Sequence, residues 1–435
     1  MSDVMWLALE DKTRVRSNKA LFWSVLITAL FGIYNILNIH ALFLLGLFVM
    51  AISLLLCNDE ELFLVTSFLI PNIMMIKESK SFFAIVSYYV LFINIKRLIK
   101  KRTLKIDVFV FFHFISVLIT TILHFQLDVA LSAIKTIVFL TYISSFFENP
   151  KSLGTQYKEK IIWYYILGLV ANVLFGIAFY LYQDKTIFSN LFAGIRNDRN
   201  YFSAMLSFGI AISLAMVRLK KKRTGAYLVC TLFFLFFGFV SQSRTFLLSL
   251  FFSVVILLSF LRRERTRKIL LAIAVALFLG NILYGDKVVI PLLERFLDDD
   301  VLTGSGRTDS WKYFISLTFS SPLRGIFGNG FGGQYLTDIN FVEHNTYIQA
   351  ISTVGTLGAI LLLSMYISIY SKLFRTKQRK DLYAYMPLLT TLFFNAFINS
   401  LYSLQFDVSL FIGCLLIDLA TTKKVDNREI KLGFS

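Results

Sequence analysis

The stretch IHALFLLGLFVMAISLLLC, residues 39–57, decides the fold of this chain. It contains no Asp, Glu, Lys or Arg, and at ~1.5 Å per residue it is long enough to cross the ~30 Å hydrocarbon core of a bilayer as an α-helix. Lipid offers the backbone no hydrogen bonds, so a segment of this kind satisfies its own by becoming helical. The stretch therefore predicts a transmembrane helix.

Similar apolar runs continue on both sides of this stretch. Reading each run as a span predicts an all-α, polytopic transmembrane bundle of about 12–14 helices. The runs at 61–76 and 81–95 are short, so they form either two spans or a re-entrant or interfacial pair. The candidate spans are 20–37, 39–57, 61–76, 81–95, 107–125, 129–147, 161–182, 201–218, 225–240, 245–261, 268–285, 344–370, 384–401 and 405–422.

The composition excludes two other classes of protein. Hydrophobic residues make up 57% of the chain and charged residues 16%, against roughly 45–50% and about 25% in an ordinary soluble domain. The 46 Phe and only five Pro fit long lipid-facing helices, whereas a β-barrel has short alternating segments between many turn residues.

The net charge of +17 is explained by where the charge lies. Thirty-two of the 44 Lys and Arg fall in seven segments that each adjoin an apolar run. This is the positive-inside pattern of a membrane protein, which places both termini in the cytoplasm and argues against nucleic acid as a partner. The segments are 1–20, 96–105, 148–160, 218–223, 262–268, 372–380 and 423–435.

Two outward-facing loops stand out because the other connections are short. They cover 183–200 and 286–343, and long loops in a compact protein are more often functional than not. We expect N-terminal transmembrane helices over 1–182, a catalytic half over 183–422 and a cytoplasmic tail over 423–435. The first twenty residues lack the pattern of a cleaved signal peptide.

Cysteine and histidine spacing predicts no metal site. Cys57, Cys230 and Cys414 lie singly within apolar runs and are expected to be buried or lipid-facing thiols. His113 and His124 fall on aromatic helix surfaces, where we expect structural roles.

A few arginines oppose the positive-inside bias because they lie on the expected outer side. Arg199 and Arg244 precede spans that run from outside to inside, so both stand at helix N-termini, where the macrodipole disfavours a cation. An anion shared with the free backbone N–H groups reverses that effect. Together with Arg196 and Arg307, they predict an outward-facing phosphate or diphosphate site, for which the guanidinium fork is suited. The alternative is an arginine that snorkels or pairs with a loop carboxylate.

His344 opens the span expected at 344–370, again on the outer side. A helix N-terminus disfavours imidazolium, so the ring should stay neutral and able to accept a proton, as a general base must. Glu343 either orients the ring or favours the first helical turn electrostatically. The alternative for a lone histidine here is a cap or interface residue.

The segment GSGRTDSWKYFISLTFSSPLRGIFGNGFGG, residues 304–333, leads towards this histidine. Its glycines do not form a dinucleotide loop, because no βαβ unit surrounds them. Arg307 and Trp311 share one face if the segment is helical, and the glycines supply a tight loop near a ligand or the His344 helix. Lys135 lies within a span and is a further candidate for the anionic site, whereas Asp407 is left unassigned.

Three motifs lie within about 190–360: RNDRNYFSAML, SQSR, and GRTDSW leading through SPLRGIFGNGFG to EHNTYIQAISTVGTLG. Together they resemble the O-antigen polymerase and O-antigen ligase superfamily of bacterial membrane glycosyltransferases, which has the C-type fold. The chain departs from the family pattern at NDRN, where a proline is common before the asparagine and this chain has Arg199.

The resemblance implies a substrate and site residues. It implies an undecaprenyl-diphosphate-linked oligosaccharide in the bacterial inner membrane as substrate, with the active site on the outer face, membrane lipids around it, and neither cofactor nor metal. A chain-length regulator is a further candidate partner. His344 with Glu343 is then catalytic, the four arginines bind the diphosphate, and the supporting candidates are Asn200, Trp311, Asn345 and Lys135.

Three functions remain open from the sequence. The first is a polysaccharide polymerase for O-antigen or capsule, which passes the growing glycan onto an incoming lipid-linked repeat unit with inversion. The second is an O-antigen ligase that transfers finished polymer to lipid A core. The third is a flippase for lipid-linked oligosaccharide, although related halves and a charged midplane cavity, which usually accompany alternating access, are not evident.

Overall fold

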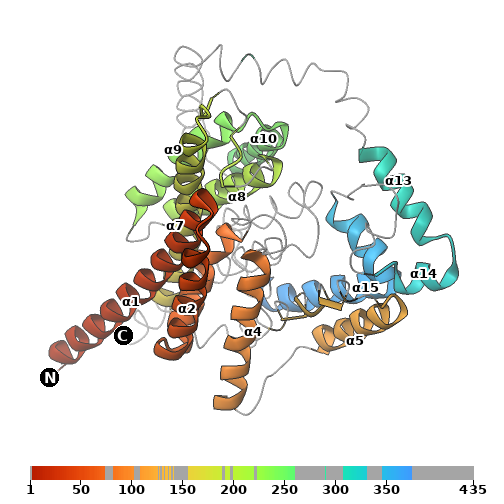
Figure 1. The fold of residues 1–435 in the computed structure, drawn as a ribbon, viewed down its shortest axis with the longest axis horizontal. Coiled ribbons are helices and arrows are strands. Elements are labelled where there is room, and N and C mark those ends of the chain that lie inside the picture. Colours follow the sequence, from red (N-terminus) through yellow and green to blue (C-terminus); the bar gives the residue numbers. More distant parts are fainter. Residues whose placement is uncertain are drawn as a thin grey trace, which may run out of the picture. The chain divides into compact units, whose positions relative to one another are not determined.

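In the computed structural model, the described part of the chain contains helices and turns but no strand (Figure 1). The all-α class predicted from the apolar runs is therefore confirmed. The described residues are 2–73, 82–101, 108–125, 127, 130, 131, 133–135, 137, 138, 141, 155–188, 192–195, 199–219, 223–259, 290, 307–330 and 345–374.

Four described helices are long and apolar enough to cross a membrane, and three shorter ones are apolar throughout. All seven coincide with expected spans, which confirms a polytopic membrane protein. The expected spans at 268–285, 384–401 and 405–422, and much of 129–147, lie outside the described residues. The four long segments are Asn18–Leu37, Thr155–Tyr182, Arg199–Arg218 and Thr346–Met365; the shorter ones are His40–Leu56, Val108–Leu123 and Thr224–Val240.

The described helices group into two units. The first unit contains the early helices and α7, whereas α5 belongs to the second unit with the later helices. These units therefore do not follow a simple division of the chain at residue 182, and the expected catalytic half stays a prediction about function. The first unit contains α1 (Ser2–Leu37), α2 (His40–Leu56), α3 (Asp59–Leu69), the 3₁₀ turn η1 (Ile70–Asn72), α4 (Phe82–Lys101) and α7 (Thr155–Tyr182).

The surface of α2 shows why these helices belong in lipid. Leu44, Phe48 and Leu55 are 64%, 61% and 82% exposed, a degree of exposure that a row of large apolar side chains rarely has on a water-soluble protein.

Helix α3 is a short helix buried inside the first unit. Every residue from Glu61 to Ile73 is buried, and the eleven residues of α3 span only about 17 Å at 1.5 Å per residue. Its end lies against the middle of α7, where a side chain at Gly168 would overlap the carbonyl oxygen of Phe68. Helix α3 alone therefore does not cross a bilayer.

Two buried asparagines satisfy the backbone where α3 ends. The side-chain amide of Asn72 donates to Gly168 O at 3.0 Å, and that of Asn172 donates to Pro71 O at 2.8 Å. Carbonyls freed at a helix end need such donors when they are buried. The two side chains thus fix the end of α3 onto α7.

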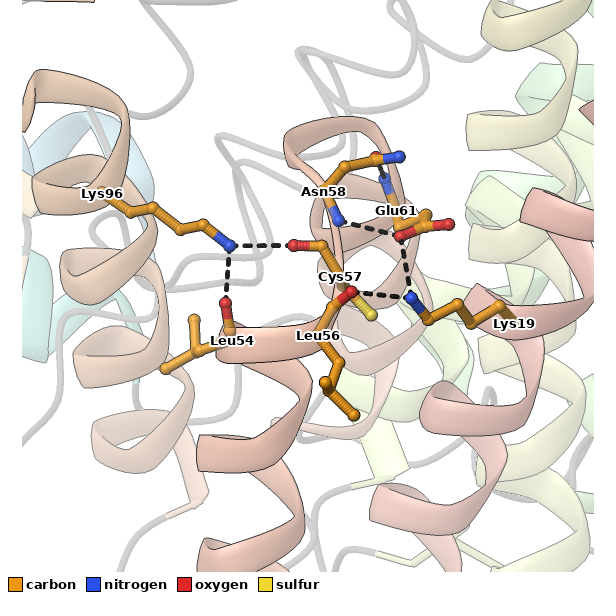
Figure 2. Close-up of polar contacts among 7 residues, drawn as sticks. All are labelled: Lys19, Leu54, Leu56, Cys57, Asn58, Glu61 and Lys96. Carbon is orange, nitrogen blue, oxygen red and sulfur yellow. Dashed lines mark hydrogen bonds and ion pairs between the residues drawn. The ribbon is translucent and has the colours of Figure 1, made fainter. Parts of the chain in front are cut away.

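Two lysines hold the other end of this unit (Figure 2). Lys19 of α1 donates to Leu56 O at 2.7 Å, and Lys96 of α4 donates to Leu54 O at 2.6 Å and Cys57 O at 2.8 Å. These carbonyls end α2, where the helix dipole is negative and an ammonium group is favoured. Lysines from two helices therefore meet at one turn.

The same turn starts α3 with a capping box. The side chain of Asn58 accepts from Glu61 N at 2.9 Å, and the Glu61 carboxylate accepts from Asn58 N at 2.8 Å. Lys19 lies 3.8 Å from that carboxylate, and Tyr157 at the start of α7 donates to Glu60 O at 2.9 Å. Three segments expected on the cytoplasmic side thus lie at one end of the unit.

The second unit contains seven described helices. Helix α8 packs on α9 and α10, while α5, α13 and α14 pack on α15. Buried Phe192 lies against Phe202 of α8 and Phe237 of α9 in the first group. The helices are α5 (Val108–Leu123), α8 (Arg199–Arg218), α9 (Thr224–Val240), α10 (Arg244–Ser259), α13 (Arg307–Thr318), α14 (Pro322–Phe327) and α15 (Thr346–Phe374).

Candidate functional site

The N-termini of α8 and α10 meet in the second unit. Arg199 is the first residue of α8 and Arg244 the first of α10, and both side chains are half-buried. Ser243 donates to the Asn200 side-chain oxygen at 3.1 Å and accepts from the Ser203 hydroxyl at 2.9 Å. Two arginines 45 positions apart in sequence therefore stand at two joined helix starts.

The turn between α9 and α10 lines this junction with buried polar groups. It consists of Ser241, Gln242 and Ser243, which are 0%, 4% and 1% exposed. Gln242 has the positive φ of 48°, and its amide donates to Phe188 O at 3.5 Å. A left-handed backbone is uncommon for glutamine and is found where a turn requires it. The turn is therefore compact, polar and shielded from solvent.

This arrangement concentrates positive potential. Each helix start carries about half a positive charge, because the first backbone N–H groups of a helix have no acceptor in the preceding turn of the same helix. Neither α8 nor α10 has an acidic residue in its first turn to offset it. Two such starts with two guanidinium groups are suited to an oxyanion such as a phosphate.

A second group of predicted residues lies on α13, whose helical form agrees with the expectation. Arg307 is its first residue and Trp311 follows one turn later; both are half-buried. Ser310, Phe314 and Thr318 form the buried stripe of this helix. The 3.6-residue period thus places Arg307 and Trp311 on the same face of α13 as this stripe.

The glycine segment joins the end of α14 to a break in α15. Gly328 and Gly330 have φ values of 81° and 87°, which glycine adopts without strain. The backbone N–H groups of Asn329 and Gly330 donate to Ser352 O at 2.7 Å and Thr353 O at 3.0 Å. The loop therefore contacts the helix that follows His344. Gly332 and Gly333 lie outside the described residues.

Asn345, and not His344, caps α15. Its side-chain oxygen accepts from Tyr347 N at 2.9 Å and Ile348 N at 3.1 Å, and the helix begins at Thr346. Asparagine is a preferred N-cap because its short side chain reaches these N–H groups. The expected helix start at 344 was therefore two residues early, and His344 comes directly before the cap.

His113 lies in α5 and His124 lies just after it, and both make structural contacts, as expected. His113 Nδ1 lies 3.2 Å from Gly358 O, and His124 Nε2 lies 3.0 Å from Gly328 O. Thr120 also donates to Phe327 O at 2.7 Å. These contacts attach α5 to α15 and to the glycine segment.

Lys135 is half-buried in the second unit. Its neighbours Ala133 and Ile137 pack with Val117 of α5 and Val354 of α15. Three predicted site residues, Arg196, Glu343 and His344, lie outside the described residues, as does Asp407.

The structure thus brings some of the predicted site residues together, and for the others their place in one site stays a prediction. Hydrogen bonds connect the α8 start, with Arg199 and Asn200, to the α10 start, with Arg244. The α13 group and Asn345 are connected through α15. A single clamp of four arginines stays a prediction. Among the described residues, no group of three or more His, Cys, Asp or Glu is arranged to hold a metal ion.

Several residues that build these junctions were not singled out from the sequence. Ser243 carried a usable signal, because serine before an apolar run is a common N-cap. Asn329 and Gly355 carried none, because a buried amide and a mid-helix break depend on a segment that is distant in sequence.

A family model described as O-antigen ligase matches residues 228–363 of the chain. No curated protein matches the chain. The matched segment contains most of α9, all of α10, α13 and α14, and the first part of α15. It therefore includes Arg244 of the first group and all of the second group. This match supports the resemblance of the chain to the O-antigen polymerase and ligase superfamily of membrane glycosyltransferase-like enzymes, and together with the apolar helices it indicates an integral inner-membrane protein.

Proposed function

We propose that this protein is a polysaccharide polymerase acting on lipid-linked repeat units. It transfers the growing glycan from undecaprenyl diphosphate to a hydroxyl of the incoming unit, on the outer face of the membrane. The observation that carries the proposal is the junction of the α8 and α10 starts with Arg199 and Arg244. The family match over 228–363 supports the same class of substrate.

Arginines suit the leaving group of this reaction. The bond between the anomeric carbon and the diphosphate breaks, and negative charge grows on the departing diphosphate oxygens. Fixed guanidinium and N–H donors stabilise that charge in a site shielded from water. We assign this role to Arg199 and Arg244, together with Arg196 and Arg307.

A neutral histidine suits the other half of the reaction. The acceptor hydroxyl attacks the anomeric carbon from the face opposite the diphosphate, so the configuration inverts. His344 accepts the hydroxyl proton, with Glu343 as its orienting partner. The products are the extended glycan on the incoming carrier and a free lipid diphosphate, and neither a metal nor a cofactor enters the scheme.

Extension of purified lipid-linked repeats by the purified protein tests this proposal. The wild-type protein should convert single repeats into polymer, and His344→Ala should lower the rate about 10²–10⁴-fold while the single repeats accumulate. His40→Ala is the matched control, because that histidine is exposed at the start of α2 and has no role in the proposed reaction. Full-length polymer made by His344→Ala at the wild-type rate would refute the assignment.

The ligase of the same superfamily is the second candidate, because the matching family model is described as O-antigen ligase. Both reactions use the same lipid diphosphate donor, so the arginines suit either. The lipid species left in a deletion strain separates them: single repeats accumulate without a polymerase, and long polymer remains on its carrier without a ligase. Transport of lipid-linked repeats into proteoliposomes without extension would instead indicate a flippase.

A further inference from the structure

Helix α15 consists of two half-helices. Its sequence runs apolar from Thr346 to Phe374, but Gly355 has φ 70° and ψ −177°, which is not helical. Carbonyl groups before such a break need donors from elsewhere when they are buried. Ser352 and Thr353 are both buried. The groups that donate hydrogen bonds to their backbone carbonyls therefore hold the first half of α15 in place.

The backbone of residues 328–330 supplies those donors. Asn329 N donates to Ser352 O and Gly330 N to Thr353 O, at 2.7 and 3.0 Å. A side chain at Gly328 would overlap the Thr353 carbonyl, and one at Gly355 would overlap that of Ile326. Glycine at both positions therefore lets the two backbones meet directly.

The side chain of Asn329 ties three elements together. It is 3% exposed, and its amide donates to Thr318 Oγ1 of α13 at 2.9 Å and to Ser352 Oγ of α15 at 3.5 Å. One buried residue thus connects the end of α13, the loop after α14 and the first half of α15.

The loop that carries Asn329 is itself fixed from the other side. Thr120 of α5 donates to Phe327 O, and His124 lies 3.0 Å from Gly328 O. Thr356 at the start of the second half donates to Gly325 O at 2.9 Å. The loop is therefore anchored to α5 and to both halves of α15.

We propose that Asn329 is a positioning residue for the reaction assigned above, on which this inference rests. It holds the first half of α15, so the loop 328–330 sets the position of the cap Asn345, the residue that follows the proposed base His344 in the sequence. The break at Gly355 separates this first half from the second half, which contacts α14 through Thr356 and Gly325.

Kinetics of Asn329→Ala test this role. A base moved by about 1 Å can cost up to ~10²-fold in rate, so kcat should fall ~10–100-fold while KM for the lipid-linked repeat changes less than about twofold. The pH profile of kcat should also change shape. Ser352→Ala removes only the 3.5 Å bond and should have a smaller effect.

A buried asparagine of the first unit is the matched control. Asn72→Ala also removes side-chain hydrogen bonds to buried groups, so it should lower the melting temperature while kcat per folded molecule and its pH profile stay as in wild type. If Asn329→Ala behaves like Asn72→Ala, Asn329 is only structural and the proposal fails.

Spin labels give a measurement that does not depend on activity. With Cys57, Cys230 and Cys414 replaced by serine, one pair of labels at Leu323→Cys and Tyr347→Cys reports on the first half of α15. A second pair at Leu323→Cys and Leu363→Cys reports on the second half. All three labelled positions are exposed.

Asn329→Ala should broaden or shift the distances of the first pair and leave those of the second pair unchanged. Equal shifts in both pairs, or no shift in either, would overturn the inference. A wild-type protein that extends no repeats would instead refute the proposed function, and the label distances would still report whether Asn329 holds the half-helix.

Discussion

Cations stand at opposite ends of helices in the two units. In the first unit, Lys19 and Lys96 donate to carbonyls that end α2, where the helix dipole favours a cation. In the second unit, Arg199 and Arg244 begin α8 and α10, where the dipole opposes a cation by about 0.3–1 kcal/mol each. The lysines therefore stabilise the end of α2 directly, whereas an oxyanion bound beside the two arginines would gain from both helix starts.

The largest effect should come from an arginine. Arg244→Ala should lower the rate of glycan extension about 10²–10³-fold, because loss of one donor to a developing oxyanion typically has that effect. Turnover per folded molecule of the purified protein measures this loss. Unchanged turnover would show that Arg244 does not bind the substrate diphosphate, and the contrast with the structural lysines of the first unit would fail.

Lys96→Met should lower stability and leave turnover unchanged. Its ammonium makes two hydrogen bonds to α2 carbonyls in a half-buried setting, and hydrogen bonds to a charged group contribute roughly 1.5–3 kcal/mol when shielded. We expect a loss of about 1–2 kcal/mol in unfolding free energy with turnover per folded molecule unchanged. Lys312→Met is the control, because that side chain is 81% exposed. Equal destabilisation by both changes would contradict the role of Lys96.

Lys19→Met should give a smaller loss. This side chain is 42% exposed, so solvent screens its contacts with Leu56 O and Glu61, and we expect roughly 0.3–1 kcal/mol. The loss should shrink as salt is raised, because ions screen an exposed cation. Denaturation at low and high salt checks this. A salt-independent loss would point to packing of the lysine stem instead.

The labelling rate of the Cys57 thiol reports whether the same end of the first unit stays closed, and it requires no substitution. Burial raises the pKa of its thiol to about 11, and nearby Glu61 adds to the rise, while Lys19 and Lys96 lower it. The thiolate is the reactive form, so maleimide labelling should be slow at pH 7.5 and increase towards pH 11. Rapid labelling at pH 7.5 in the folded protein would show that this end opens.

The sequence predicted features that depend on local chemistry. Apolar runs predicted the helical spans, since each helix satisfies its own backbone in lipid. Arg199, Arg244 and Arg307 are each the first residue of a helix, as expected for the first two from the polar residues just before each span. Cys57 and Cys230 are buried, and His113 and His124 contact backbone carbonyls, as their settings indicated.

Features that depend on distant partners could not be predicted. The end of α3 is set by Asn172 and Gly168 of α7, about a hundred positions later. The break in α15 is set by backbone groups that lie beside it only after folding. The exact start of α15 was missed because His344 and Asn345 are adjacent polar residues, and only cap geometry shows which one receives the N–H groups.

The contacts of the broken helix close chain loops of very different length. Asn329 and Ser352 are 23 positions apart, whereas Thr120 and Phe327 are 207 apart. Closing the longer loop costs about 2 kcal/mol more in chain entropy, and at roughly 5–20 residues per second its two ends are synthesised about 10–40 s apart. During that interval Thr120 of α5 and the following His124 lack the carbonyl partners at Phe327 and Gly328, which are not yet synthesised. We therefore expect α5 to be made first during biosynthesis and to contact the glycine segment only after that segment has been synthesised.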